Sequence, residues 1–162
     1  MPEQRLWAPW RMRYVQGERD DEGCIFCLAA RAGEDEERHV LGRSAHCLVM
    51  LNAFPYNSGH LMIAPHRHVP SIERLDGDGL LELMTLAQRA LAALRDAYQP
   101  HGFNLGINEG EIAGAGFADH VHLHVVPRWA ADSNFNRRHG SLGHKPPGAR
   151  LRELTNVARN YN

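Results

Sequence analysis

The stretch HVHLHVV at residues 120–126 places three histidines at alternate positions, with valine and leucine between and after them. Successive side chains of an extended strand point to opposite faces. The pattern therefore predicts a strand with His120, His122 and His124 on one face and apolar residues on the other. Such a strand can be simply half-exposed, can supply metal ligands, or can present neutral imidazoles as nucleophiles and protonated ones as phosphate-binding groups.

The rest of the sequence predicts one long helix among several short strands. Apolar residues recur at helical spacing over residues 80–98, so we expect a helix that begins after the turn residues at 76–79 and ends at Pro100. A glycine-rich loop is expected at 109–116. The predicted strands are residues 46–52, 59–69, 102–108 and 120–127. This order favours an α+β fold in which an antiparallel sheet carries the helix across one face.

Composition narrows the possible partners and location. A chain of 162 residues is most economically one domain, and its formal net charge of -1 argues against a general polyanion-binding surface, so no nucleic acid partner is expected. No apolar run approaches the roughly 20 residues that span a bilayer, and the first residues lack the apolar centre of a secretory signal. Three cysteines suit a reducing compartment, so we expect a cytoplasmic protein without a membrane partner.

Two of the cysteines, Cys24 and Cys27, form a CxxC pair, which is half of a common zinc-binding signature. A redox function would need a preceding strand and a thioredoxin-like pattern, and neither is evident. A pair of buried thiols without a ligand is the remaining alternative. Cys47 lies in a predicted buried strand and is expected to be a core residue.

These motifs together resemble the histidine triad (HIT) superfamily of nucleotide hydrolases and transferases. The family motif, three histidines alternating with apolar residues, fits residues 120–126 at every position, and LVMLNAFPYNSGHLMIAPHRHV is similar to its nucleotide-binding segment. The resemblance runs from about residue 24 to 135, and LWAPWR, PYNSGHL and PRWAADSNF resemble the bacterial branch with diadenosine polyphosphate phosphorylase or hydrolase activity. It implies a HIT-like domain at 1–135, including an N-terminal arm, and an atypical basic tail at 136–162.

The resemblance implies a role for each of several residues. His122 attacks the α-phosphorus and forms a covalent nucleotidyl-histidine, and His124 hydrogen-bonds phosphate oxygens. Asn52 holds ribose hydroxyls, although a turn-capping side chain is the alternative. Asn108 is a candidate phosphate contact or a strand-end residue. Arg128 either binds a distal phosphate or makes a surface ion pair.

The loop before the triad departs from the family pattern. Many members carry Gly-Gln-Ser or Gly-Gln-Thr there, whereas this chain has Gly116-Phe117-Ala118. Either the backbone amides of Gly114, Ala115 and Gly116 replace those phosphate donors, or phosphate binding is weaker or differently arranged.

In zinc-bearing members the CxxC pair is completed by a histidine of a PxxH segment and by the first triad histidine. The matching residues are His68 and His120, with His66 as an alternative to His68. Two thiolates and two imidazoles make a closed tetrahedral set, which is expected to be structural rather than catalytic.

We therefore expect an enzyme that cleaves dinucleoside polyphosphates, with an adenine nucleotide as substrate and either inorganic phosphate or water as the second nucleophile. The family architecture also implies a sheet of about five strands with one long helix, and a homodimer with a continuous sheet. A purine nucleoside phosphoramidase is one alternative. A zinc-stabilised nucleotide-binding or interaction module without turnover is another.

Overall fold

The computed structural model describes residues 23–31, 33–130 and 132. The predicted N-terminal arm and the predicted basic tail at 136–162 lie outside the described residues, so the domain division at residue 135 stays a prediction. The elements along the chain are α2 (Ile25–Ala29), β1 (Val40–Arg43), β2 (Cys47–Leu51), β3 (Leu61–Pro65), η2 (Ile72–Arg74), α3 (Gly77–Tyr98), β4 (Gly102–Ile107), η3 (Glu111–Ala113) and β5 (Leu123–Arg128).

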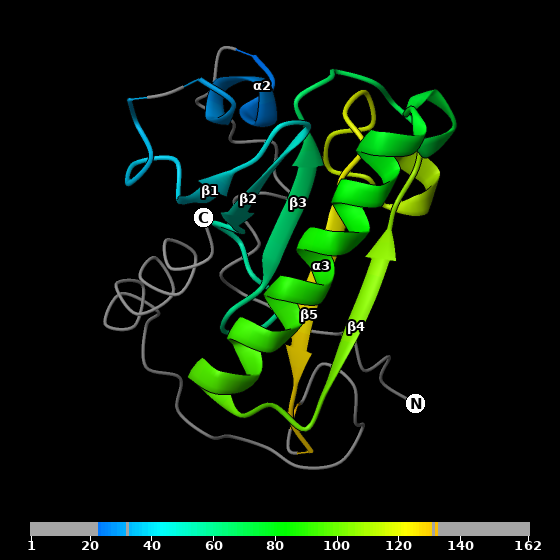
Figure 1. The fold of residues 1–162 in the computed structure, drawn as a ribbon. Helices are drawn as coiled ribbons and strands as arrows, with labels where there is room; N and C mark the ends of the chain where they lie inside the picture. Colours follow the sequence, from blue (N-terminus) through cyan, green and yellow to red (C-terminus); the bar gives the residue numbers. More distant parts are fainter. Residues whose placement is uncertain (1–22, 32, 131, 133–162) are drawn as a thin grey trace.

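The five strands form one antiparallel sheet in the order β1-β2-β3-β5-β4, with the single long helix α3 lying across it (Figure 1). The predicted α+β fold is confirmed. Strand β5 is the last of the described strands but is inserted between β3 and β4, so it has a neighbouring strand on each side. β1 was not among the strands predicted from individual segments; it pairs with β2 through an irregular register between Val40 and Gly42.

The helix α3 begins and ends at residues that suit those positions. The Asp76 carboxylate accepts a hydrogen bond from the Gly79 backbone N–H at 2.8 Å, which caps the helix, and Gln99 adopts the left-handed conformation that ends it. The helix therefore starts within the turn residues that were expected to precede it. No helix in the described part of the chain is long and apolar enough to cross a membrane.

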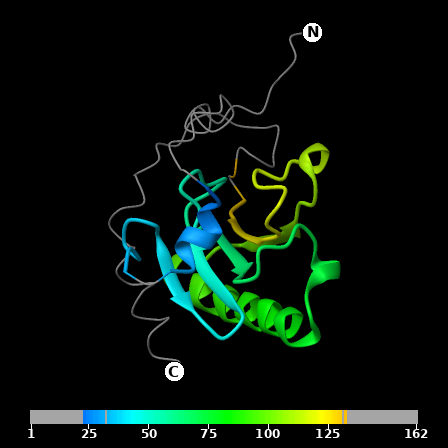
Figure 2. The same ribbon diagram turned by 90° about the horizontal axis from the view of Figure 1, so that it is seen from above.

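Two cores lie on opposite sides of the sheet (Figure 2). The α3-side core contains Cys47, Leu51, Leu61, Ile63, Leu83, Ala87, Ala90, Leu94, Leu123 and Val125. The α2-side core contains Phe26, Ala29, Val40, Leu48, Met50, Met62 and Ala64, with Phe117 packed against it. Met62 lies opposite His124 in the β3–β5 pairing, and paired residues share a face. His124 therefore belongs to the α2 side.

Glu82 ties α3 to the turn between β1 and β2. Its Oε1 accepts hydrogen bonds from Ser44 Oγ at 2.5 Å, from the His46 N–H at 2.7 Å and from the Cys47 N–H at 2.9 Å. Burial would raise the pKa of Glu82, but these three hydrogen bonds outweigh it and lower the pKa below the ordinary value.

Candidate active site and metal-binding site

The three histidines of the triad are adjacent but are not all in one strand. β5 begins at Leu123, so the expectation that His120 and His122 lie within the strand is wrong. His120 lies in a bend that ends the preceding turn, and His122 lies in the short stretch that leads into β5, in which the Val121 N–H donates to the Val69 carbonyl at 2.7 Å. His122 and His124 still point to the same side of the chain, since their ring centroids are 4.7 Å apart.

His122 is buried, with 3% of its surface exposed, and its tautomer follows from one hydrogen bond. Its Nδ1 lies 2.9 Å from the backbone carbonyl of His120. A carbonyl only accepts, so Nδ1 carries the proton and Nε2 keeps a lone pair. Burial lowers the pKa of His122, although the carbonyl acts in the opposite direction, so the ring is neutral near pH 7. Nε2 is therefore the nitrogen that is available to act as a nucleophile.

The tautomer of His124 is set through a second buried histidine, His60, whose surface is 1% exposed. The Tyr56 N–H donates to His60 Nδ1 at 3.1 Å, so His60 carries its proton on Nε2. That Nε2 lies 3.0 Å from Nδ1 of His124. His124 then accepts at Nδ1 and holds its own proton on Nε2, where it can donate to a phosphate oxygen.

Sequence reasoning missed His60 as a functional residue. The available signal was a histidine inside the apolar run GHLMIAP, but a lone histidine in such a run is equally typical of a core residue. Its connection to the triad spans 64 positions and has no local pattern.

Cys24, Cys27, His68 and His120 form a cluster whose potential ligand atoms all lie within 4.8 Å of one another. Cys24 Sγ lies 3.2 Å from His120 Nδ1, and Cys27 Sγ lies 3.2 Å from His68 Nδ1. Ligand atoms around a tetrahedral zinc ion are about 3.3–3.8 Å apart, so the spacing and the chemistry of the donors fit a metal. We call these four residues the thiol–imidazole cluster.

The orientation of His120 favours this use. Its Nε2 donates to the Pro65 carbonyl at 2.8 Å, which leaves the Nδ1 lone pair directed at the thiols. Burial lowers the pKa of His120 and so also keeps the ring unprotonated. The alternative ligand His66 is not in the cluster; its Nε2 lies 2.9 Å from the Ser44 carbonyl.

Helix α2, which carries the CxxC pair, is fixed at its C-terminal end by Arg43. The guanidinium donates to the Ala29 carbonyl from Nη2 at 2.6 Å and from Nε at 3.0 Å, and to the Arg31 carbonyl at 2.7 Å. It also pairs with the Asp35 carboxylate. This satisfies carbonyls that a helix end leaves without partners.

The contacts of the two predicted asparagines are local. Asn52 Oδ1 accepts from the Phe54 N–H at 2.9 Å, which is the turn-capping alternative. Asn108 Nδ2 donates to the Gly114 carbonyl at 3.4 Å and so braces the loop. Their nucleotide-binding roles stay predictions.

The glycine-rich loop contains the short helix η3. The Gly114 N–H donates to the Glu111 carbonyl at 2.9 Å, and the Ala115 N–H donates to the Gly110 carbonyl at 3.2 Å. In this conformation two of the three amides predicted to bind phosphate serve the loop itself. Their role, together with that of Gly116, stays a prediction.

Arg128 at the end of β5 lies in a polar network. Its Nε donates to Asn104 Oδ1 at 2.6 Å, and its Nη1 lies 3.2 Å from a carboxylate oxygen of Asp132. Asn57 also donates to that carboxylate and to the Pro127 carbonyl. The ion-pair alternative for Arg128 matches these contacts.

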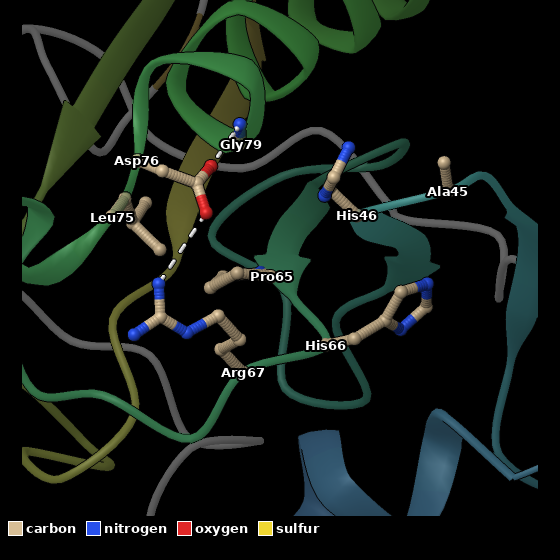
Figure 3. A pocket seen from close by; sticks show the side chains of 8 residues that line it. All are labelled: Ala45, His46, Pro65, His66, Arg67, Leu75, Asp76 and Gly79. Carbon is tan, nitrogen blue, oxygen red and sulfur yellow. Dashed lines mark hydrogen bonds and ion pairs between the residues drawn. The ribbon is translucent and has the colours of Figure 1, made fainter.

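A small hollow lies between the β1–β2 turn, the end of β3 and the start of α3 (Figure 3). Arg67 and Asp76 form an ion pair of 3.5 Å across one side of it. The hollow is lined by Ala45, His46, Pro65, His66, Arg67, Leu75, Asp76 and Gly79. None of these residues belongs to the triad, so the hollow is not the candidate active site.

Comparisons with known proteins agree with this geometry. The sequence profile of the HIT domain family matches residues 34–131, more than half of the chain. An AP-4-A phosphorylase of Mycobacterium tuberculosis is 41% identical over 139 residues, which cover 82% of this chain and 71% of that protein. An adenosine 5'-monophosphoramidase of Schizosaccharomyces pombe is 29% identical over 105 residues, which cover 65% of this chain and 74% of that protein.

Solved structures show the same fold. A zinc-bound histidine triad family protein from Mycobacterium smegmatis superposes with a TM-score of 0.65 at 24% identity, covering 85% of this chain and 94% of that one. A HIT family member from Bacillus subtilis gives a TM-score of 0.60 at 22% identity, covering 87% and 98%.

Proposed function

Because this chain belongs to the HIT domain family, we propose that it cleaves dinucleoside polyphosphates, such as diadenosine tetraphosphate, at the α-phosphate through a nucleotidyl-histidine intermediate. The observation that carries the proposal is the His122 Nδ1 contact with the His120 carbonyl, which leaves Nε2 as a neutral nucleophile. The relative of 41% identity, an AP-4-A phosphorylase, supports the substrate class.

The reaction takes place in two displacements. His122 Nε2 attacks the α-phosphorus, a P–N bond forms, and the bond from that phosphorus to the bridging oxygen breaks, so that a nucleoside polyphosphate leaves. The His120 carbonyl holds the Nδ1 proton while positive charge develops on the ring. A second nucleophile, inorganic phosphate or water, then displaces the nucleotide from His122. Dividing the reaction in this way replaces one difficult step by two easier ones.

His124 assists both steps. Its Nε2 proton, placed there by His60, can be donated to a phosphate oxygen on which charge increases in each transition state. Preorganised donors of this kind usually supply a large part of the rate enhancement, because they need no reorientation during the reaction.

The thiol–imidazole cluster is proposed to hold one zinc ion. All four positions would be protein ligands, so the ion would be structural and would join α2 to the segment before β5. The structural neighbour described as zinc-bound supports this proposal.

A homodimer with a continuous sheet is also proposed. β4 is an edge strand, since among the described strands it pairs only with β5. Leu105 on this strand is 41% exposed. An edge with unpaired backbone groups and an exposed apolar side chain suits pairing with a second copy of the chain.

A purine nucleoside phosphoramidase is a second candidate function. The S. pombe relative is an adenosine 5'-monophosphoramidase, and the same Nε2 atom can attack a phosphorus bonded to nitrogen. A binding module without turnover is the third.

The deciding experiment is incubation with diadenosine tetraphosphate, with and without inorganic phosphate, followed by product analysis. ADP plus ATP formed only with phosphate would establish phosphorolysis. AMP plus ATP formed without phosphate would establish hydrolysis at the α-phosphate, whereas two ADP would mean cleavage between the β-phosphates and would contradict attack at the α-phosphorus. Turnover of adenosine 5'-monophosphoramidate alone would favour the second candidate, and no product from either substrate would favour a binding module.

Two variants test the nucleophile. His122→Ala should abolish turnover and the mass increase of one AMP that marks the intermediate. His101→Ala is the matched control, because His101 is an exposed histidine at the start of β4 whose Nδ1 accepts from the Ala130 N–H. Wild-type rates in His122→Ala would refute the assignment.

A further inference from the structure

Phe26 lies between the two cysteines of the CxxC pair and is fully buried. Its ring centroid is 4.6 Å from that of His122, with an interplanar angle of 34°, and 5.1 Å from that of His120. One side chain of α2 therefore packs against both a cluster histidine and the proposed nucleophile.

Phe117 supports Phe26 from another side. The two rings meet edge to face, with centroids 5.7 Å apart and an angle of 76°. Phe117 occupies the stretch in which many family members carry polar phosphate donors. In this chain, Phe117 instead packs against Phe26 close to the triad.

The contact with Phe26 bears on the orientation of the His122 ring. The imidazole presents Nε2 to substrate only while Nδ1 remains on the His120 carbonyl. Rotation about the side-chain torsions would break that hydrogen bond and direct another ring edge outward. In a close-packed interior, a large flat neighbour removes the space that such a rotation needs. Phe26 is such a neighbour, and the His124 ring, 4.7 Å away, is another.

Helix α2 cannot hold Phe26 by its own stability. It has only five residues, and Cys24 at its start makes no side-chain capping hydrogen bond. Isolated helices of this length are unstable in water. Arg43 fixes the C-terminal end, whereas the N-terminal end is held by the packing of Cys24, Ile25 and Phe26 in the α2-side core and by the contacts of the two cysteines with His68 and His120.

We propose that Phe26 is a positioning residue that keeps the His122 ring oriented for attack, and that a metal in the thiol–imidazole cluster keeps Phe26 in place. The cluster would then act on the active site through α2, beyond stabilising the fold. The inference rests on the proposed function only in taking His122 as the nucleophile.

The test uses the full chain loaded with zinc. Phe26→Ala should lower kcat for diadenosine tetraphosphate by about 10- to 100-fold with KM changed less than about threefold, because misplacement of a reacting group slows the chemical step. Phe26→Leu, which restores part of the volume, should recover part of kcat. Leu83→Ala is the matched control, since Leu83 is 2% exposed but packs in the α3-side core.

A second readout does not depend on turnover. Imidazole proton–nitrogen NMR of the substrate-free protein should show a single Nδ1–H tautomer for His122 in the zinc-loaded wild type. Phe26→Ala and removal of zinc by a chelator should each give a mixture of tautomers, and added zinc should restore the single form in the wild type only. Leu83→Ala should keep it.

The outcomes separate the two proposals. A folded Phe26→Ala with wild-type kcat and an unchanged His122 signal would overturn the positioning role. If Phe26→Ala does not fold, a wild-type kcat and an unchanged His122 signal in Phe26→Leu would overturn the positioning role instead. If the His122 NMR signal does not change when zinc is removed, the proposed role of the metal in holding Phe26 is overturned. If the wild type turns over no substrate, the proposed function fails, whereas the NMR readout still decides the inference.

Discussion

Nε2 of His60 lies 3.0 Å from Nδ1 of His124, although 64 positions separate the two residues. The Tyr56 N–H at His60 Nδ1 fixes the direction of this hydrogen bond, so His60 donates and His124 accepts. A backbone group in the β2–β3 connection thereby decides which nitrogen of a triad histidine carries the proton.

Replacing His60 should therefore impair catalysis without removing a group that contacts substrate. We expect His60→Ala to lower kcat by about 10- to 100-fold, because His124 loses the partner that keeps its proton on Nε2. Steady-state kinetics would measure the effect. A larger change in KM than in kcat would contradict the assignment, and His101→Ala should be near wild type.

The rate should stay high at mildly acid pH. Burial lowers the pKa of His122 below its ordinary value of 6.5, so the midpoint of the acid limb of the rate profile should lie below pH 6.5. The free energy of unfolding should also decrease as the pH is lowered below 6.5, because the imidazole binds a proton more readily in the unfolded chain than in the folded one. A pH profile of kcat/KM with its acid limb centred above 6.5 would exclude this interpretation.

Glu82 should contribute stability that depends on its charge. The pKa of Glu82 is lower in the folded protein than in the unfolded chain. Its contribution to stability is therefore fully present above the unfolded pKa of about 4.3 and is lost as the pH falls through the folded pKa. Glu82→Gln should reduce the free energy of unfolding at pH 7 by about 1–3 kcal/mol. Urea unfolding at pH 7 and pH 3.5 would measure this, with the exposed Glu73→Gln as control. An equal loss at both pH values would contradict a charge effect.

Metal content should depend on the CxxC pair. The purified wild type is expected to contain about one zinc per chain. Cys27→Ser should contain much less zinc, and its Tm should be lower than that of the wild type by about 5 °C or more. Cys47→Ser should retain zinc, because burial raises the pKa of Cys47 to about 12 and the thiol lies in the α3-side core. Elemental analysis decides, and fewer than about 0.2 equivalents in the wild type would count against the site.

Gly59 should not tolerate a side chain. It has a φ of +79°, and a Cβ there would lie 3.0 Å from Leu94 Cδ2. Gly59→Ala should lower the free energy of unfolding by about 1–3 kcal/mol through strain and crowding. Gly102→Ala is the control, because no described atom lies within 4 Å of a Cβ at that position. Equal stabilities of the two variants would show that the loop adapts.

Local periodicity was enough to predict much of the fold. The helix α3, the β2–β3 pair and β4 follow from spacing within single segments, because helical and extended chains bring different residue separations to one face. β1 was missed as a segment because its four residues contain too few alternations to be distinguished from a loop. β5 starts three residues later than expected, since strand pairing depends on a partner strand as well as on the alternation.

The members of the thiol–imidazole cluster were also predictable. CxxC, the PxxH segment and the first triad histidine contain the ligand types, and the fold brings all four together. The choice between His66 and His68 could not be made from proximity in the sequence. The tertiary structure decides it, because His68 lies in the cluster whereas His66 lies against the Ser44 carbonyl.

Alternation in the chain decided that three imidazoles and their apolar neighbours would separate onto two sides, because that separation is a property of extended backbone. Only the tertiary structure decided what each imidazole can do. Pro65 directs His120 toward the thiols, the His120 carbonyl frees Nε2 of His122, and His60 makes His124 a donor. A proton's place on an imidazole depends on the nearest acceptor or donor, and folding brings those partners from distant parts of the chain.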